Sequence, residues 1–327
     1  MMTLPEEIYS NMYMIKILIP KNPLKATNSY IIKDKNRNLV IDTGIHQNET
    51  IDIMRMGLKE LDVDLEETDF FITHIHSDHL DLALNLAPNS SKIFFNKPDT
   101  NDLARCKTWN DELHNIAAIC GFPESRLQKT IERYAWDRYL GLDPNRFTIL
   151  KEGDKLDFGG FHFKCIETPG HSRGHMCLYE PGKKILIAGD HILDDITPNI
   201  SLFSYKENPL RDYLQSLDKV FNLDIELVLP GHRGFIKDCN RRIQELKNHH
   251  RIRIDEILSE LENNRKDAFH IASKITWDMK CDSWELSPMH QKLFASLETI
   301  AHLKYLEEEG LIQKEIEEKK LLFSLKE

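Results

Sequence analysis

The sequence lacks several patterns that would each point to a particular class of protein. Its six cysteines include no CxxC pair, and scattered cysteines in a chain of this size indicate reduced thiols in a cytosolic protein. No stretch approaches the roughly 20 apolar residues of a membrane span. Residues 1–16 have neither the basic start nor the apolar centre of a signal peptide. These absences predict a cytoplasmic protein with no membrane partner.

An excess of basic residues is also missing. The formal net charge is −10, and binding to nucleic acid needs a concentrated basic face, so the charge argues against such a partner. No GxSxG or reactive-cysteine pattern marks a nucleophilic side chain. The remaining composition, 41% hydrophobic and 29% charged, is that of an ordinary globular protein. A length of 327 residues fits one large domain with a smaller one.

Three histidines and one aspartate stand close together at His74, His76, Asp78 and His79. The apolar run 69–73 before them predicts a buried strand, so the cluster lies where a strand ends and a loop begins. Alpha/beta folds gather ligands at such ends. Imidazole and carboxylate groups are ligands that zinc, iron and manganese accept. Surface-loop histidines are the alternative, but this spacing rarely arises by chance.

The HxHxDH spacing resembles the signature of the metallo-β-lactamase superfamily. Members outside the true lactamases add three later ligands in the order His, Asp, His, and the chain has a residue of each type in a suitable context: His171 after Thr-Pro-Gly, Asp190 after Ala-Gly and His232 after Pro-Gly. The resemblance implies an α/β fold, the αββα sandwich. It also implies a first metal on His74, His76 and His171, a second on Asp78, His79 and His232, and a bridging Asp190.

The same resemblance implies a hydrolase with two divalent metal ions, zinc first and iron or manganese as alternatives. Two such ions share a water and lower its pKa from near 16 toward about 7, which yields hydroxide to attack a carbonyl or phosphorus. Asp78 and Asp190 would be the catalytic residues, with Asp78 also able to accept a proton. The favoured small-molecule substrate is a thioester or other acyl ester, as in the glyoxalase II branch. A phosphodiesterase or ribonuclease and a non-catalytic metal-binding protein are the alternatives.

Apolar periodicity predicts the elements around these residues. The resemblance implies that the Asp42-Thr43-Gly44 element at the end of one strand lies next to the metals, so Asp42 is expected to orient a ligand histidine or a loop; a plain strand-end carboxylate is the alternative. Residues 28–33 and 38–42 should form a hairpin. The predicted strands are 13–20, 28–33, 38–42, 69–73, 93–95, 147–150, 155–158, 161–168, 176–179, 184–188 and 227–229, and the predicted helices are 48–61, 80–86 and 209–220.

A long segment in the middle of the chain fits no core element of that fold. Residues from about 99 to 145 are helical in composition and rich in aromatic side chains: Trp109, Phe122, Tyr134, Trp136 and Tyr139. We interpret this segment as a helical lid insertion. An aromatic lid suits an organic substrate with an apolar portion, although the same side chains could instead pack the insert onto the body.

The composition changes near residue 240, so we predict a catalytic domain at 1–240 and a winged-helix-like C-terminal domain at 241–327. Helices are predicted at 241–261, 267–279 and 287–309, followed by short strands at 313–316 and 320–325. From residue 241 on there are 15 Lys and Arg against 17 Asp and Glu, a difference of 15 − 17 = −2. This balance weighs against DNA binding, and we interpret the tail as a packing or dimerising module, with a homodimer as an open alternative.

Three further residues are candidate substrate contacts. Arg173 follows the ligand His171 closely, and a guanidinium there could hold a carboxylate or phosphate bidentately or be a surface charge. Asn199 and Tyr205 are weaker candidates in the loop after Asp190. His175 is expected to be a hydrogen-bonding or core histidine and not a ligand, and His191 is also not expected to be a ligand.

Overall fold

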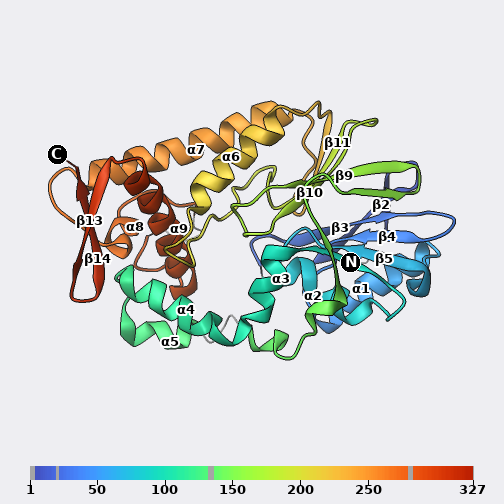
Figure 1. The fold of residues 1–327 in the computed structure, drawn as a ribbon, viewed down its shortest axis with the longest axis horizontal. Coiled ribbons are helices and arrows are strands. Elements are labelled where there is room, and N and C mark those ends of the chain that lie inside the picture. Colours follow the sequence, from blue (N-terminus) through green and yellow to red (C-terminus); the bar gives the residue numbers. More distant parts are fainter. Residues whose placement is uncertain (1–3, 20–21, 132–135, 279–282, 327) are drawn as a thin grey trace. The chain divides into compact units, whose positions relative to one another are not determined.

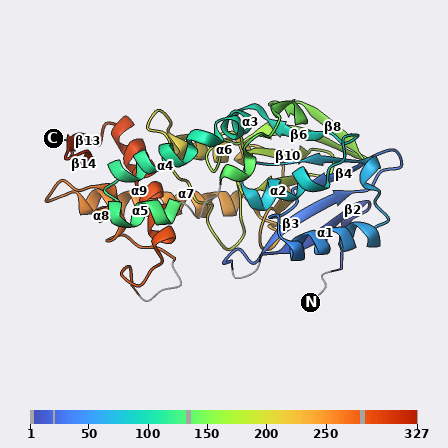
Figure 2. The same cartoon turned by 90° about the horizontal axis from the view of Figure 1, so that it is seen from below.

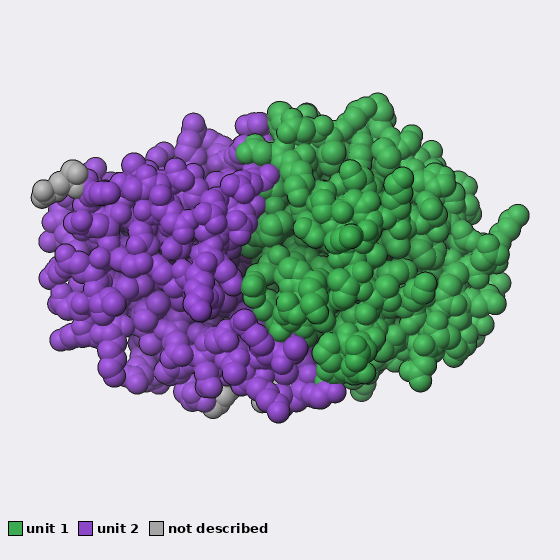
Figure 3. All heavy atoms as spheres, in the orientation of Figure 1, with its two compact units in different colours: residues 1–103, 142–198, 216–243 green, residues 104–141, 199–215, 244–327 purple. Residues whose placement is uncertain are grey.

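The computed structural model describes residues 4–19, 22–131, 136–278 and 283–326, and the statements below concern these residues. The chain contacts define two compact units (Figure 3). Unit 1 contains residues 1–103, 142–198 and 216–243, and unit 2 contains residues 104–141, 199–215 and 244–327. The units therefore group two internal segments with the C-terminal residues, whereas the predicted domains divide the chain once, at residue 240. Which domain carries which function stays a prediction.

Unit 1 is built on two β-sheets, the first with seven strands in chain order. Strands β4 to β7 run parallel to their neighbours, and β1 to β4 pair antiparallel. The predicted hairpin of residues 28–33 and 38–42 is confirmed as β3 and β4. The strands are β1 (Glu6–Tyr9), β2 (Met12–Leu18), β3 (Ala26–Ile32), β4 (Asn38–Ile41), β5 (Thr68–Phe71), β6 (Ile93–Asn96) and β7 (Phe147–Leu150).

The second sheet has five strands in the order β12-β11-β10-β9-β8. All of its pairs are antiparallel except β11 with β12, which are parallel. Because β11 and β12 run in the same direction, the loops that follow them leave from the same edge of the sheet. The strands are β8 (Lys155–Phe158), β9 (Phe161–Glu167), β10 (Met176–Glu180), β11 (Ile185–Gly189) and β12 (Leu227–Pro230).

The two sheets share one apolar core, which contains Tyr30 and Phe71 of the first sheet and Phe163 and Leu178 of the second. Figure 1 shows the sheets as neighbouring layers. Helix α1 (Asn48–Glu60) packs on β2, where Gly57 leaves room for Ile15, and it lies beside β2 and β3 in Figure 2. This arrangement confirms the mixed α/β fold with two sheets and flanking helices.

Short polar and 3-10 segments join the remaining helices of unit 1. Three helices, α3, α6 and α7, contribute residues to both units. The elements are α2 (Ser77–Leu86), α3 (Lys97–Ala104), α6 (Pro209–Phe221), α7 (Cys239–Glu260) and the 3-10 turns η1 (Leu65–Glu67) and η4 (Pro144–Arg146).

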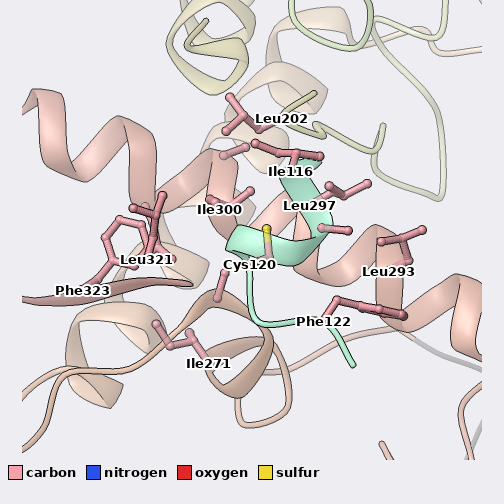
Figure 4. Packing of buried hydrophobic residues seen from close by; sticks show 14 of the residues in the cluster. Ile116, Cys120, Phe122, Leu202, Ile271, Leu293, Leu297, Ile300, Leu321 and Phe323 are labelled. Carbon is pink, nitrogen blue, oxygen red and sulfur yellow. The ribbon is translucent and has the colours of Figure 1, made fainter. Parts of the chain in front are cut away.

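Unit 2 is mainly helical and has a core of its own. Figure 4 shows side chains of this core, among them Ile116, Cys120, Leu297 and Phe323. Helix α9 leads into an antiparallel hairpin, β13 with β14. The elements are α4 (Cys106–Ile119), α5 (Glu124–Ile131), η3 (Trp136–Tyr139), α8 (Ala268–Ala272), α9 (Met289–Glu308), β13 (Ile312–Glu317) and β14 (Lys320–Leu325).

Two predicted elements need correction. Strand β1 was not predicted, because its sequence Glu-Glu-Ile-Tyr is polar and its residues are mostly exposed. The helix predicted at 267–279 ends at Ala272, since the carbonyl of Ala272 accepts the indole N–H of Trp277 at 2.7 Å instead of continuing the helical ladder. Asp267 caps its start through the amide of His270.

Several predictions remain open. Segment 99–145 is largely helical, and Trp109 packs edge-on against Phe203 inside unit 2; its role as a lid stays a prediction, and Tyr134 lies outside the described residues. The order α8, α9 and β13–β14 is the predicted one, but the winged-helix assignment stays a prediction. Five buried cysteines are free thiols, and Cys281 lies outside the described part. Among the described helices, none is long and apolar enough to cross a bilayer.

Candidate metal centre

The seven predicted metal ligands converge within unit 1. They come from the loop after β5 and the start of α2, and from the loops after β9, β11 and β12. Each of the three overlapping groups has its ligating atoms within 4.8 Å of one another: His74, His76 and His171; His74, His79 and Asp190; and Asp78, His79 and His232. Strand ends of both sheets thus deliver the predicted ligands to one place.

Asp190 lies between the two predicted metal groups. Its Oδ2 is 3.6 Å from Nε2 of His171 on one side and 3.4 Å from Nε2 of His232 on the other. Its Oδ1 is 3.5 Å from Nε2 of His79. Asp78 reaches the second group only, with Oδ2 at 3.5 Å from Nε2 of His232. A carboxylate in the position of Asp190 is the one that can contact ions in both groups.

The hydrogen bonds of His79 and His232 fix which ring nitrogen faces the centre. Nδ1 of His232 donates to the carbonyl of Ala26 at 2.7 Å, and Nδ1 of His79 donates to the carboxylate of Asp42 at 2.8 Å. In its neutral form, each ring therefore presents an unprotonated Nε2, and these two atoms face each other at 3.3 Å. Metal-binding histidines are oriented in this way, by a carboxylate or carbonyl on the outer nitrogen.

His74 is oriented by the same carboxylate through one intermediate. The hydroxyl of Thr73 donates to Asp42 at 2.8 Å, so its oxygen accepts from Nδ1 of His74 at 2.9 Å. Nε2 of His74 is left unprotonated and faces Nδ1 of His76 at 3.0 Å. Nδ1 of His76 can donate a hydrogen to that atom, and in the other neutral tautomer of His76 both nitrogens offer lone pairs to one cation. The donor atoms present therefore fit divalent metal ions.

Asp99 ties together the two loops that carry the first metal group. It is fully buried. Its Oδ2 accepts from the amide of Ile75 at 2.9 Å and the hydroxyl of Ser172 at 3.0 Å, and its Oδ1 accepts from the amide of Gly174 at 2.7 Å. Ile75 lies between His74 and His76, and Ser172 follows His171. Asp99 thereby sets the spacing of ligands that are distant in the chain.

The electrostatics divide the histidines into two kinds. Burial lowers the pKa of His74, and lowers that of His76 to about 3, so both are neutral. Burial also opposes the charged forms of His79 and His232. The carboxylates of Asp42 and Asp190 outweigh burial at His79, and the carboxylate of Asp190 outweighs it at His232, so both pKa values are raised. In the absence of a metal ion, the second group therefore favours a bound proton on His79 and His232.

Little space is left around the second group. A side chain at Gly231 would place its Cβ 2.6 Å from Oδ1 of Asp190 and 2.7 Å from Cε1 of His79. The loop that carries Gly231 and His232 is held by β3, since Asn28 and Tyr30 donate to the carbonyl of Pro230 at 3.0 and 2.7 Å. The close approach of this loop to Asp190 and His79 therefore depends on Gly231 and on hydrogen bonds from residues far away in the sequence.

The predicted substrate contacts are each paired with a carboxylate of their own unit. Arg173 donates to Asp102 at 2.8 Å in unit 1. In unit 2, Asn199 donates to Glu298 at 2.6 Å and Tyr205 to Glu307 at 2.8 Å. Their role as substrate contacts stays a prediction.

The two histidines set apart from the ligands behave differently from each other. His175 accepts from the amide of Asp190 at 3.1 Å and contacts the hydroxyl of Thr168 at 2.8 Å, so it holds the backbone of the bridging residue. His191 is buried, and burial lowers its pKa to about 3. Sequence reasoning missed Asp99, although its place directly after β6, on the edge of the sheet that carries His74, was a usable signal.

The Metallo-beta-lactamase superfamily model matches residues 22–232, and the chain belongs to that superfamily. Members of this superfamily usually bind divalent metals. Lactamase-like protein aptB of Emericella nidulans is 26% identical over 246 residues, which cover 74% of this chain and 62% of that protein. The chain thus matches less than two thirds of that relative's length.

Two other relatives match larger shares of their own length. Probable metallo-hydrolase YqjP of Bacillus subtilis is 25% identical over 297 residues, covering 86% of this chain and 88% of that protein. Human Acyl-coenzyme A thioesterase MBLAC2 is 25% identical over 215 residues, covering 63% of this chain and 72% of that protein. The crystal structure of metallo-beta-lactamase family protein TTHA1429 from Thermus thermophilus superposes with a TM-score of 0.81 at 26% identity, over 98% of this chain and 100% of that one.

Proposed function

We propose that the protein is a hydrolase of thioesters or related acyl esters that works with two divalent metal ions, zinc in the first place. The observation that carries the proposal is the convergence of seven candidate ligands, of which His74, His79 and His232 already have the outer ring nitrogen hydrogen-bonded in the ligand orientation. Bound at this place, the ions supply Lewis acidity and an acidified water for attack on a carbonyl.

The residues of the chain have distinct parts in this proposal. His74, His76 and His171 would hold one ion and Asp78, His79 and His232 the other, and Asp190 would serve both. Asp78 is more exposed than Asp190, with 18% against 7% of the side chain accessible, so it is the carboxylate better placed to take up a proton. Asp42 and Asp99 keep the ligands oriented and do not touch the substrate.

The substrate class rests on two supports. The human relative is named an acyl-coenzyme A thioesterase, and the net charge of −10 disfavours a polyanionic nucleic acid. Phosphodiester cleavage remains the alternative reaction for the same ligand set, and a non-catalytic metal-binding protein is the third hypothesis. Partner and location stay predictions: a small-molecule substrate, a homodimer and the cytoplasm.

The test is a substrate panel on the purified full chain after zinc loading. Acyl-coenzyme A thioesters of different chain length are followed by thiol release, and bis-p-nitrophenyl phosphate by absorbance. We expect thioester hydrolysis that chelation abolishes and zinc restores. The Asp190→Asn variant should lower kcat/KM by at least about 100-fold, within the range of removing a central electrostatic group.

A matched control is Asp157→Asn, because Asp157 is an exposed carboxylate on β8 that contacts only His162 in the described structure. It should leave kcat/KM unchanged. Faster cleavage of the phosphodiester than of any thioester would overturn the substrate assignment. Absence of all hydrolysis by a protein that holds two zinc ions would support the non-catalytic alternative.

A further inference from the structure

A second group of buried titratable side chains lies inside unit 2, on α7 and α9. His250 and Arg253 come from α7, and Glu298 and His302 from α9. Their exposed fractions are 1%, 6%, 5% and 0%, in that order. None of them belongs to the candidate metal centre, so the mechanism proposed above leaves them without a role.

The hydrogen bonds of this group fix the tautomer of His250. Nδ1 of His302 lies 2.8 Å from the carbonyl of Glu298, which can only accept, so this nitrogen carries the hydrogen. Burial lowers the pKa of His302 to about 3 and also lowers that of His250, so both rings are neutral. Nε2 of His302 must then accept, and Nδ1 of His250, 3.0 Å away, donates to it. Nε2 of His250 is left with a free lone pair of electrons.

That lone pair has no hydrogen-bond partner among the described residues, although the atom is buried. A buried polar atom without a partner destabilises the fold and calls for a bound water or ion. His250 also shows the arrangement of a ligand histidine, with its outer N–H donated to a fixed acceptor. The unpaired nitrogen thus points to a bound group that this part of the fold can hold.

Two further donors lie near His250. One ligating atom from each of His249, His250 and Glu298 lies within 4.8 Å of the others, and the two imidazole rings have centroids 5.2 Å apart. Around a tetrahedral zinc, with ligand distances of about 2.0–2.2 Å, ligand atoms are roughly 3.5 Å apart. A small inward movement of the partly exposed His249 would close the triad.

The carboxylate of Glu298 is already oriented. Its Oε1 accepts from Nη1 of Arg253 at 2.7 Å, and its Oε2 accepts from the amide of Asn199 at 2.6 Å. Arg253 is itself held over the ring of Trp277 at 3.9 Å. Each carboxylate oxygen keeps a second lone pair. Because Arg253 balances the charge of Glu298, the two imidazoles must supply most of the affinity, which favours zinc and its neighbours over magnesium or calcium.

We propose that His249, His250 and Glu298 form a separate site for one divalent transition-metal ion, zinc or a close analogue, which joins α7 to α9. The proposal is independent of the hydrolase function, because it involves none of the seven residues of the candidate metal centre. A fourth position is left for water.

The test separates this site from the candidate metal centre. The full-length His74→Ala/His232→Ala variant disables the candidate metal centre. Zinc per chain is then measured by elemental analysis after dialysis. We expect about one retained zinc. Adding His250→Gln should weaken zinc affinity by at least about 100-fold, more than a change in an outer hydrogen-bond partner usually does, and should remove the absorption bands of bound cobalt(II). The control is His270→Gln, an exposed histidine of the same unit, which should change neither.

A second measurement keeps the candidate metal centre intact. In the otherwise unaltered chain, His250→Gln and Glu298→Gln should each lower bound zinc by one equivalent. Zinc should raise the Tm of unit 2 in the parent chain by roughly 5 °C but not in these variants. Retention of no zinc by the folded double variant, or equal zinc in the parent and His250→Gln chains, would overturn the proposal and leave a buried water as the partner of His250.

Discussion

The carboxylate of Asp42 lies 2.8 Å from Nδ1 of His79, and the same oxygen accepts the hydroxyl of Thr73, which orients His74. One side chain at the end of β4 therefore sets the tautomers of two histidines that the proposal assigns to different metal ions. The centre depends on this outer carboxylate as well as on its ligands.

Replacing Asp42 by Asn is expected to lower zinc affinity about 10–100-fold. If the amide NH2 faces His79, it turns the ring to the tautomer with a hydrogen on Nε2. If it faces the other way, it meets the amide of Thr73, which now donates to Asp42 at 2.8 Å. Affinity is measured by competition with a chromogenic chelator. The control is Asp69→Asn, a buried carboxylate of β5 that pairs with Arg37; an equal loss there would contradict the assignment.

Asp99→Asn should separate metal binding from stability. Whichever way the new side-chain amide is turned, its NH2 group faces a backbone N–H, of Ile75 or of Gly174, that donates to the carboxylate in the parent chain. The loops of Ile75 and Gly174 must then shift, so zinc affinity is expected to fall about tenfold or more. Burial raises the pKa of Asp99 to about 6, above the ordinary 3.8. The folded chain thus binds this proton more tightly than the unfolded chain, and this group stabilises the metal-free fold as pH falls from about 6 to 4.

The Asn variant has no proton to bind at this position. The gain in unfolding free energy between pH 6 and pH 4 should therefore be smaller in Asp99→Asn than in the parent chain. Urea unfolding of metal-free protein at both pH values measures it. Identical pH dependence in the two chains would count against a buried, ionisable Asp99.

Zinc affinity should fall as the pH is lowered. The raised pKa values of His79 and His232 mean that the ion-free centre holds protons near neutral pH. Zinc must displace them, so each proton released weakens binding by up to about tenfold per pH unit below those pKa values. Calorimetric titration in buffers of different ionisation enthalpy counts the protons. A count of zero at pH 7 would show that the histidines are already unprotonated.

Gly231→Ala is expected to disrupt the second metal group with little effect elsewhere. The new methyl carbon would stand 2.6 Å from Oδ1 of Asp190 and 2.7 Å from Cε1 of His79, so one of these side chains must move. We expect loss of roughly one zinc per chain, since overpacking of this kind typically costs about 1–3 kcal/mol. Gly182→Ala is the control, because its Cβ would meet Glu180 at an ordinary 3.5 Å.

The seven candidate ligands could be selected from the sequence because each has a local pattern. His74 to His79 form one motif, and the other three ligands follow Pro-Gly or Ala-Gly turns at strand ends. Most strands, and the hairpin of β3 with β4, were predictable for the same reason: apolar runs alternate with turn residues.

Contacts between distant residues were beyond that reasoning. Asp99 is joined to backbone groups 24 and 75 residues away, and its place after β6 points to the sheet edge but not to these partners. The early end of α8 is decided by Trp277, which lies beyond the helix. The division into units was also hidden, because residues 104–141 and 199–215 join the C-terminal segment through packing that no short motif encodes.

The hydrogen bonds from Asn28 and Tyr30 to Pro230 span 202 and 200 residues. A chain emerging from the ribosome therefore carries the first three histidines long before the loop that places His232 is made. Until that loop docks on β3, the second group lacks its third candidate ligand, His232. A nascent chain is thus expected to acquire its full complement of ions late in synthesis, after residue 232 has left the exit tunnel.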